Sequence, residues 1–342
     1  MNKNEINYHR RFISFLGQKM LTLHLDTVLQ ICGNLPDRGK ISLSASSKQL
    51  GCIRYNVLYR EQVYIKHILC TSYFDRFTNL YVSDTEHALP KEATHLEFSG
   101  TFDQIIGKFI NVGVTHVIFG SNFNQSILGC LPASITHLKF GKYFDQQIYD
   151  SIPDSVVHIE FGTRFNQSVK NCVPKSVTYL KFGELFNCPV SGNLPHSITH
   201  LIFGEYYNQS LDNLPPFLTH LKLNCYSGSP VFNLPKSVTH LTLKFCTFLE
   251  YLVKCTHVTH LTLKNRYDQI RVPLSVTHLT FGDQFYGSIS GIIPESCTHL
   301  TIFSEMLQLP LTIPESIVEI KLPTRYSLPI SDNILSHAKI IR

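Results

Sequence analysis

The fifteen residues 134–148, SITHLKFGKYFDQQI, contain the pattern that decides the fold of this 342-residue chain. Related stretches are SVVHIEFGTRFNQSV (155–169), SVTYLKFGELFNCPV (176–190), SITHLIFGEYYNQSL (197–211) and SVTHLTFGDQFYGSI (275–289). A unit this short cannot bury its own apolar face, so the copies must stack into an array. The residue in the histidine slot marks twelve copies, spaced 18 to 21 residues apart: His95, His116, His137, His158, Tyr179, His200, His220, His240, His260, His278, His299 and Glu319.

Each copy predicts one short β-strand. The segment 136–140, THLKF, alternates in polarity and is rich in β-prone residues, so Leu138 and Phe140 share one face while His137 and Lys139 point the other way. Gly141 ends the strand. A proline stands five residues ahead of the marker in ten of the twelve copies, where no backbone donor is needed for the ladder. The sequence therefore predicts a repeat solenoid of the leucine-rich-repeat kind, with one parallel strand per 20–21 residues over residues 87–326.

A second column predicts the rest of the core. Seven residues after the marker most copies carry an aromatic residue, mostly followed by Asn or Asp. Such a pair suits an inward ring beside a short polar side chain that bonds neighbouring backbone at a turn. Because about twenty residues complete each coil, we expect short turns and 3₁₀ pieces on the return rather than full helices. The aromatic residues are Phe102, Phe123, Phe144, Phe165, Phe186, Tyr207, Tyr267 and Phe285.

Composition excludes several classes of protein. With 43% apolar and 16% charged residues, the chain can bury a substantial core and is not intrinsically disordered. The net charge of +5 arises in the first seventy residues, so the array itself is close to neutral and a nucleic-acid partner is not expected. No apolar run has the length of a signal peptide or a membrane span. We expect a soluble, intracellular protein, cytoplasmic or nuclear and not secreted, with no membrane partner.

The ten cysteines form no Cys-x-x-Cys pair and no regular framework, which argues against structural zinc and against disulfides. We expect them to be reduced and mostly buried. There is also no glycine-rich phosphate loop and no nucleophile elbow in the sequence. The sequence therefore predicts no cofactor, no metal and no enzyme activity.

The histidines of the repeat form a column that we interpret as structural, with contact to a partner as the alternative. Metal sites need several ligands that converge about 2 Å from one ion, whereas these imidazoles stand in a line, one strand apart. No column of carboxylates accompanies them to orient the rings or act as a base. Neighbouring imidazolium ions would repel each other, so the column should resist protonation and the array should lose stability below about pH 6. The members are His95, His116, His137, His158, His200, His220, His240, His260, His278 and His299.

The candidate partner-binding surface lies on the same side of the predicted sheet. Residues two positions past each marker point outward, and their chemistry changes from copy to copy. Solenoids commonly present such a face to a partner. The charged members of this row are Glu97, Lys139, Glu160, Lys181 and Lys222.

The unit SVTHLxFGxxFNQ resembles the FNIP repeat, a relative of the leucine-rich repeat. The resemblance covers about 235 residues, over two-thirds of the chain. The aromatic and Asn positions are partly lost in the copies marked by His220, His240, His260 and Glu319. We expect local irregularity in those copies.

Residues 21–70 predict a separate helical module, after a tail over 1–20. The spacing of apolar residues predicts a helix over 23–35, a second over 40–47 and a third over 57–69. Residues 71–86 would link this module to the array, and residues 327–342 would form a C-terminal cap or tail. One interpretation is that the helices only cap the solenoid.

The module also resembles an F-box. Matching positions are Leu23, Asp26, Val28, Ile31, Leu35, Ile41, Leu43, Ser47 and Lys48, whereas His24, Lys40, Ala45 and Leu50 depart from the pattern. The resemblance implies a substrate receptor of an SCF-type cullin-RING ubiquitin ligase, in which the helices bind a Skp-type adaptor and the solenoid binds a target protein. Its adaptor-binding residues would come from Leu23, Val28, Ile31, Leu35, Ile41 and Leu43. The alternative is a non-enzymatic scaffold for protein–protein interaction.

Overall fold

The computed structural model resolves the chain into two compact units. The N-terminal unit contains residues 1–123 and 129–136, and the C-terminal unit contains residues 124–128 and 137–342. Each unit is described by itself below. The structure describes residues 25–46, 48–224, 234–244, 249–265, 270–285, 289, 291–305, 307, 309, 313–327, 329–330 and 332–342. The predicted residues Leu23, Ser47 and Tyr267 lie outside this set.

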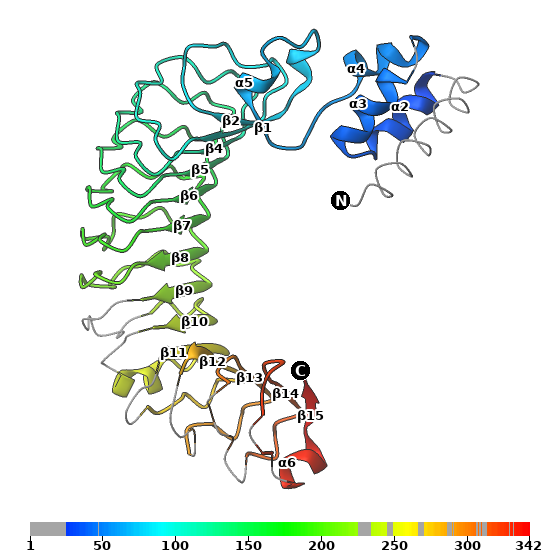
Figure 1. Ribbon diagram of the computed structural model, residues 1–342. Helices are drawn as coiled ribbons and strands as arrows, with labels where there is room; N and C mark the ends of the chain where they lie inside the picture. Colours follow the sequence, from blue (N-terminus) through cyan, green and yellow to red (C-terminus); the bar gives the residue numbers. More distant parts are fainter. Residues whose placement is uncertain are drawn as a thin grey trace. The chain divides into compact units, whose positions relative to one another are not determined.

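Helices open the described part of the N-terminal unit (Figure 1): α2 (Leu25–Gly33), α3 (Asp37–Ala45), the 3₁₀ helix η1 (Gln49–Cys52) and α4 (Ile53–Asn56). Proline is tolerated at the start of a helix, and α3 begins directly after Pro36 with an acidic residue in its first turn. Val28, Cys32, Leu43 and Ile53 are buried and form the small core of this module.

The predicted third helix over 57–69 is wrong. Residue Tyr59 instead forms a parallel bridge to Phe77, and β1 (Val63–Tyr64) pairs in parallel with β2 (Asn79–Val82). Only the short α5 (Ile65–Ile68) is helical there. Val57, Tyr59 and Val63 are β-branched or aromatic residues, and pairing with the next turn of the solenoid satisfies their backbone where an isolated short helix could not.

The rest of the N-terminal unit is the start of the solenoid. The 3₁₀ helix η2 (Phe74–Arg76) precedes β2, and β3 (His95–Phe98) and β4 (His116–Ile118) follow. The strands lie in chain order and all pair in parallel, with His95 opposite His116. Because β2 lies within 71–86, the parallel sheet begins before the array predicted from residue 87.

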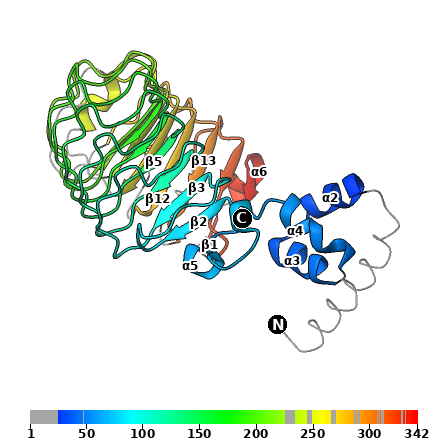
Figure 2. The same ribbon diagram turned by 90° about the horizontal axis from the view of Figure 1, so that it is seen from above.

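The C-terminal unit continues with one strand per turn, again parallel and in chain order (Figure 2). From β5 to β14 marker lies opposite marker, as in His137 with His158 and His240 with His260, and β15 places Lys339 opposite Glu319. The 3₁₀ helix η3 (Leu249–Lys254) and the helix α6 (Asp332–His337) lie between strands. The strands are β5 (His137–Lys139), β6 (His158–Glu160), β7 (Tyr179–Lys181), β8 (His200–Phe203), β9 (His220–Leu223), β10 (His240–Leu243), β11 (His260–Asn265), β12 (His278–Gln284), β13 (His299–Ile302), β14 (Glu319–Lys321) and β15 (Lys339–Ile341).

The fold is therefore a parallel β-solenoid with one strand per turn of about twenty residues, as predicted. One register shift occurs between β11 and β12, at Leu263 to Asn265, which agrees with the irregularity expected near the His260 copy. The strand β15 pairs with β14, so the sheet extends past residue 326. Among the described residues, no helix has both the length and the apolar character to cross a membrane.

Two columns of phenylalanine rings fill the core of the regular turns. Along one column the rings of Phe140, Phe161 and Phe182 stack with centroids 5.3 and 5.8 Å apart. The second column runs from Phe144 through Phe165 at about 6 Å, and the two columns touch within each turn, where Phe161 and Phe165 lie 3.8 Å apart. All five rings are buried, so each turn completes the core of the next.

The Asn and Asp residues that follow these rings act as predicted. From Asn124 to Asn187, the side-chain oxygen accepts a hydrogen bond from the backbone N–H of the residue in the same slot one turn later. Asn166 accepts from Asn187 at 2.8 Å, and Asn187 accepts from Asn208 at 2.9 Å. This ladder satisfies backbone donors that the strands leave unpaired.

The cysteines are less buried than predicted. All eight that the structure describes are free thiols, but only Cys32, Cys255 and Cys297 are buried. Cys52 and Cys70 are exposed, because they lie on the surface of the N-terminal unit outside the repeat core.

Candidate functional site

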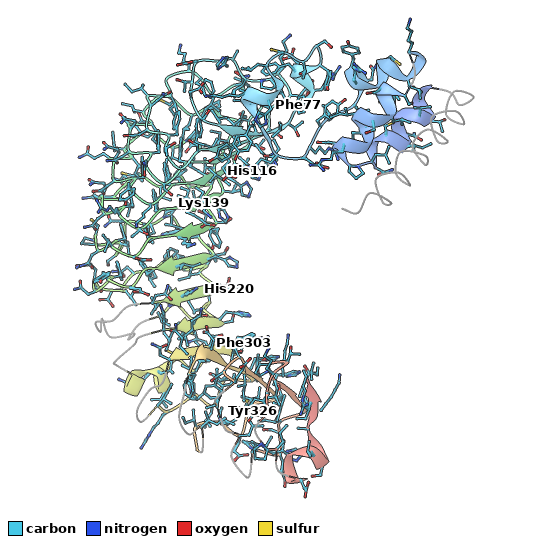
Figure 3. All side chains as sticks on the ribbon, viewed as in Figure 1. Phe77, His116, Lys139, His220, Phe303 and Tyr326 are labelled. Carbon is cyan, nitrogen blue, oxygen red and sulfur yellow. The ribbon has the colours of Figure 1, made fainter. Side chains whose placement is uncertain are left out.

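The solvent-facing side of the sheet is built by the alternation of each strand. In β8 to β10 the second and fourth residues are buried, while the marker and the residue two positions later are partly exposed. This surface, which we call the strand face, also includes the residue four positions past the marker. In the C-terminal unit, Lys139 and His220 project from it, away from the connecting loops (Figure 3).

Stacked rings form one edge of the strand face. From His200 to His299 the imidazoles stack with centroids 4.1–4.4 Å apart and planes within 16° of parallel. Tyr179 occupies the marker slot of β7, and its ring stacks 4.1 Å from that of His158. His137 and His158 are looser, at 5.3 Å. In the N-terminal unit, His95 and His116 stack at 4.2 Å.

A threonine directly before most of the histidine markers fixes how the imidazole is held, whereas Val157 precedes His158. The hydroxyl of Thr219 lies 2.9 Å from Nδ1 of His220 and 3.1 Å from the carbonyl oxygen of Thr199. A hydroxyl has one proton, so both contacts are hydrogen bonds only if Nδ1–H donates to the hydroxyl and the hydroxyl donates to the carbonyl. That tautomer leaves Nε2 as an acceptor on the strand face.

The environment of the column opposes protonation. Burial lowers the pKa of His220, His240, His260 and His278 below the ordinary 6.5, and neighbouring imidazoles lower it further. Nearly parallel rings cannot direct their Nε2 lone pairs at one ion about 2 Å away. The column therefore has the geometry of a structural stack rather than of a metal site.

Charged residues form a row beside the histidine column. Nζ of Lys181 donates to a carboxylate oxygen of Glu160 at 3.0 Å, and Lys139 approaches the same oxygen at 3.8 Å. His158 contacts the other oxygen at 3.3 Å. Burial raises the pKa of Glu160, but these hydrogen bonds and charges outweigh it and hold the pKa below its usual value. The structure thus brings Lys139, Glu160 and Lys181 together as one network.

The remaining two residues of the predicted row lie elsewhere. Glu97 belongs to the N-terminal unit, where it accepts a hydrogen bond from Gln62 at 2.7 Å. Lys222 follows the network on β9 but is separated from it by Ile202 on β8.

A groove of about 470 Å³ runs along the strand face of the C-terminal unit. Its lining includes the Lys139 network and Lys222, and also two residues that the sequence analysis did not select, Lys244 and Lys264. Both lie four positions past the marker, a slot in which six of the twelve copies have glycine. The repeated letters HLTLK at 240–244 and 260–264 were the signal that could have identified them.

The helical module divides its predicted residues between a core and a surface. Val28 and Leu43 are buried, whereas Ile31 and Ile41 are 38% and 39% exposed and Leu35 is half-buried. Of the predicted adaptor-binding residues that the structure describes, only Ile31, Ile41 and part of Leu35 are therefore accessible to a partner.

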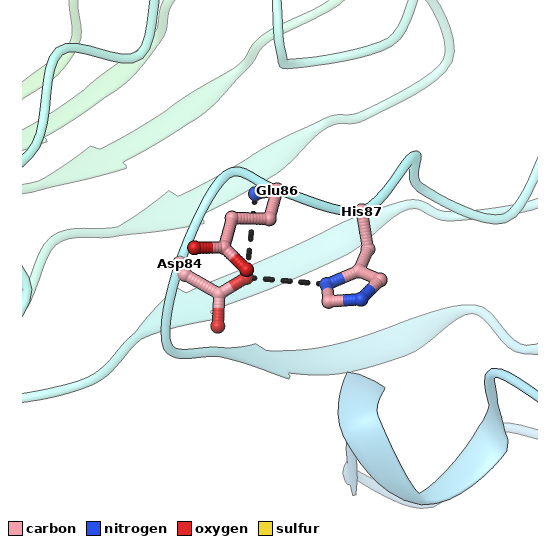
Figure 4. A group of neighbouring side chains, drawn as sticks. All are labelled: Asp84, Glu86 and His87. Carbon is pink, nitrogen blue, oxygen red and sulfur yellow. Dashed lines mark hydrogen bonds and ion pairs between the residues drawn. The ribbon is translucent and has the colours of Figure 1, made fainter.

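One cluster of potential metal ligands occurs in the N-terminal unit, at Asp84, Glu86 and His87 (Figure 4). Asp84 is buried and accepts from Nδ1 of His87 at 3.3 Å, while Lys66 forms an ion pair with it at 3.0 Å. Burial opposes the charge, but Lys66, His87 and further hydrogen bonds lower the pKa of Asp84 to about 2. The ammonium of Lys66 already supplies the positive charge that this carboxylate needs, so the cluster fits a structural turn.

Comparison with known proteins supports the assignment of the repeat. Residues 123–164 and 165–206 each match the sequence profile of the FNIP repeat. No curated protein sequence shows a significant match to the chain. A similar solved structure is described as CroV588, a novel circular LRR protein, with 31% sequence identity and a TM-score of 0.58. The match covers 78% of this chain and 43% of that one. The chain is thus a solenoid that contains FNIP repeats and is similar in fold to a leucine-rich repeat protein.

Proposed function

We propose that this chain is a non-enzymatic substrate receptor, which holds a target protein on its strand face and binds a Skp-type adaptor of a cullin-RING ubiquitin ligase through its helices. A repeat solenoid of this kind is suited to protein–protein interaction. The observation on which the proposal depends is the strand face itself, where a regular core presents a row of different side chains.

The helical module supports the adaptor half of the proposal. Its core is filled by Val28, Cys32, Leu43 and Ile53, so Ile31 and Ile41 are not needed inside. Large apolar side chains on neighbouring helices that remain exposed are typical of a surface that a partner covers. The resemblance of this segment to an F-box is the reason for proposing the adaptor as that partner.

Capture of a purified Skp-type adaptor by the full-length chain tests this half. We expect Ile31→Glu and Ile41→Glu to weaken capture by about tenfold or more, since each would place a charge in an apolar interface. Leu274→Glu is the matched control, because Leu274 is an exposed apolar residue of the C-terminal unit. It should leave capture unchanged.

Failure to capture any Skp-type adaptor under conditions where the chain is folded would contradict the receptor role. The second candidate, a scaffold whose helices only cap the solenoid, is favoured by contacts such as the 2.8 Å bond from Lys40 to the carbonyl of Leu58. In that case deletion of residues 1–56 would expose the first turn and reduce stability without changing any adaptor interaction.

A further inference from the structure

The groove on the strand face contains lysines that no carboxylate in the described part of the chain neutralises. Glu160 is engaged by Lys139 and Lys181, and Glu205 is engaged by Lys244 at 2.6 Å. Among the residues that the structure describes, no carboxylate lies within ion-pair distance of Lys222 or Lys264. Among the described residues, these two ammonium groups are therefore the lysines of the groove that lack a carboxylate partner.

Lys222 is the more deeply placed of the unsatisfied lysines. It is half-buried on β9, with Lys181 on β7 and Lys244 and Lys264 at the ends of β10 and β11. Burial lowers the pKa of its ammonium, and the charges that act on it, from Lys264, Lys181 and Lys244, all lower it further. A partly desolvated cation surrounded by other cations is destabilising until an anion joins it.

The remaining carboxylates of the groove do not supply that anion. Glu184 and Asp283 also line it, but both are exposed, Glu184 on the turn after β7 and Asp283 near the end of β12. Solvent screens charges in such positions. The half-buried floor is consequently basic even though the whole groove is nearly balanced in charge.

We infer that Lys222 and Lys264 bind an acidic side chain of a target polypeptide that lies across β7 to β11. The five strands span about 19 Å, a distance that about six extended residues would cover. The groove is open along the sheet, so it suits a side chain projected from a peptide. The shared chemistry is an anionic group, which is either the carboxylate of Asp or Glu or the phosphate of a phosphorylated residue.

This inference rests on the proposed function, because it names the chemistry of the target that the strand face would hold. It does not depend on the adaptor. The two parts can therefore fail separately: adaptor capture tests the helices, and binding of a defined peptide tests the groove.

The test uses the full-length chain and fluorescent peptides of about ten residues. One alternates Asp with Gly, a second carries phosphoserine in place of Asp, and a third carries Asn. We expect both acidic peptides to bind, more weakly at higher salt, and the Asn peptide not to bind. The stronger of the two acidic peptides identifies the anionic group.

Variants locate the site. Lys222→Met and Lys264→Met should each weaken binding on the order of tenfold, as expected for loss of a hydrogen bond to a charged group. Lys222→Arg should retain most of it, which separates loss of charge from misfolding. The matched control is Lys321→Met, because Lys321 occupies the same slot on β14 outside the groove. Each variant is also checked by its unfolding curve.

Four results would overturn the inference. The acidic peptides fail to bind the folded chain, or they bind equally well to Lys222→Met. Inorganic phosphate alone could displace them completely at low concentration, which would indicate a small-anion site. A single-stranded oligonucleotide that binds more tightly than either acidic peptide would indicate a nucleic-acid surface instead.

Discussion

Two stretches of the C-terminal unit share the same repeated strand pattern but place different residues in two of its slots. From β5 to β8 each turn has two buried aromatic rings and a glycine four positions past the marker. From β9 to β11 leucine replaces the strand phenylalanine, as at Leu223, Leu243 and Leu263, and Asn224, Lys244 and Lys264 replace the glycine. We call these the regular turns and the variant turns. The groove takes its unsatisfied lysines from the variant turns.

The glycine explains why the two stretches differ in function. At Gly183 an added methyl group would overlap the carbonyl oxygen of Gly162, and Gly162 has the same relation to Gly141. The regular turns therefore cannot carry a side chain in this slot. In the variant turns the slot is open enough for Asn224 to donate to the carbonyl of Phe203 at 2.9 Å, and for two lysines. Looser packing between the variant turns therefore allows polar and charged side chains in this slot.

The largest expected effect comes from breaking the ring columns of the regular turns. Phe165→Ala removes a fully buried ring that stacks on Phe161 and lies between Phe144 and Phe186, so it should destabilise the chain by about 3–5 kcal/mol in urea unfolding. Leu243→Ala, in a variant turn, should cost about 2–3 kcal/mol. An equal or larger loss for Leu243→Ala would mean that the ring columns do not dominate stability.

The glycine slot gives the next largest effect. Gly183→Ala should destabilise the chain by about 2–3 kcal/mol, because the backbone of the preceding turn must move away from the new methyl group. Lys264→Ala is the matched substitution in a variant turn and should change stability by less than about 0.5 kcal/mol. Chemical denaturation of the two variants measures the difference. A neutral Gly183→Ala would show that the turns can separate freely.

The same contrast shows what the sequence could predict. Strand register follows from the marker residue, because an alternating THLxF segment has only one face that suits a core, and the rings at Phe144 and Phe165 follow from their fixed offset. The basic floor was harder to predict. Lys222 occupies the slot that was examined, but Lys244 and Lys264 occupy one in which the consensus residue is glycine. A repeat consensus hides residues that differ from it, and such residues form this basic floor.

In the N-terminal segment, the sequence predicted the first two helices correctly but not the structure of residues 57–69. Residues 25–45 have helical spacing and a proline that separates two helices, and both helices are present. The apolar residues of 57–69 fit both a helical and a strand spacing. The structure forms a strand at Val63, because Val63 pairs with Leu80. The sequence also could not show that Val28 and Leu43 are buried while Ile31 and Ile41 are exposed, since burial there depends on how the helices pack.

A smaller effect should come from the amide ladder of the regular turns. Asn166→Ala removes the acceptor for the backbone N–H of Asn187, which should cost about 1–2 kcal/mol. Hydrogen exchange measured by mass spectrometry should become faster around residue 187. The exposed control Lys175→Ala should change neither stability nor exchange. Unchanged exchange at 187 in Asn166→Ala would mean that another group replaces the lost acceptor.

The histidine column, which crosses both kinds of turn, gives the smallest effect. Because the folded pKa of His220, His240, His260 and His278 is lowered, the unfolded chain binds protons first, and stability should fall as pH drops below about 6.5, the ordinary histidine value. Each stacked pair contributes no more than about 1 kcal/mol, since the rings are partly exposed to water.

Tyrosine in the marker slot of β7 supplies the control for that titration. Tyr179 stacks on His158 without binding a proton near neutral pH, so His240→Tyr should keep the stack and interrupt the row of titrating rings. Urea unfolding at pH 7.5 and 5.5 should then show a smaller loss of stability for His240→Tyr than for the unmodified chain. Equal stability of the unmodified chain at the two pH values would mean that the column accepts protons as readily when folded as when unfolded, and stacking alone would account for its geometry.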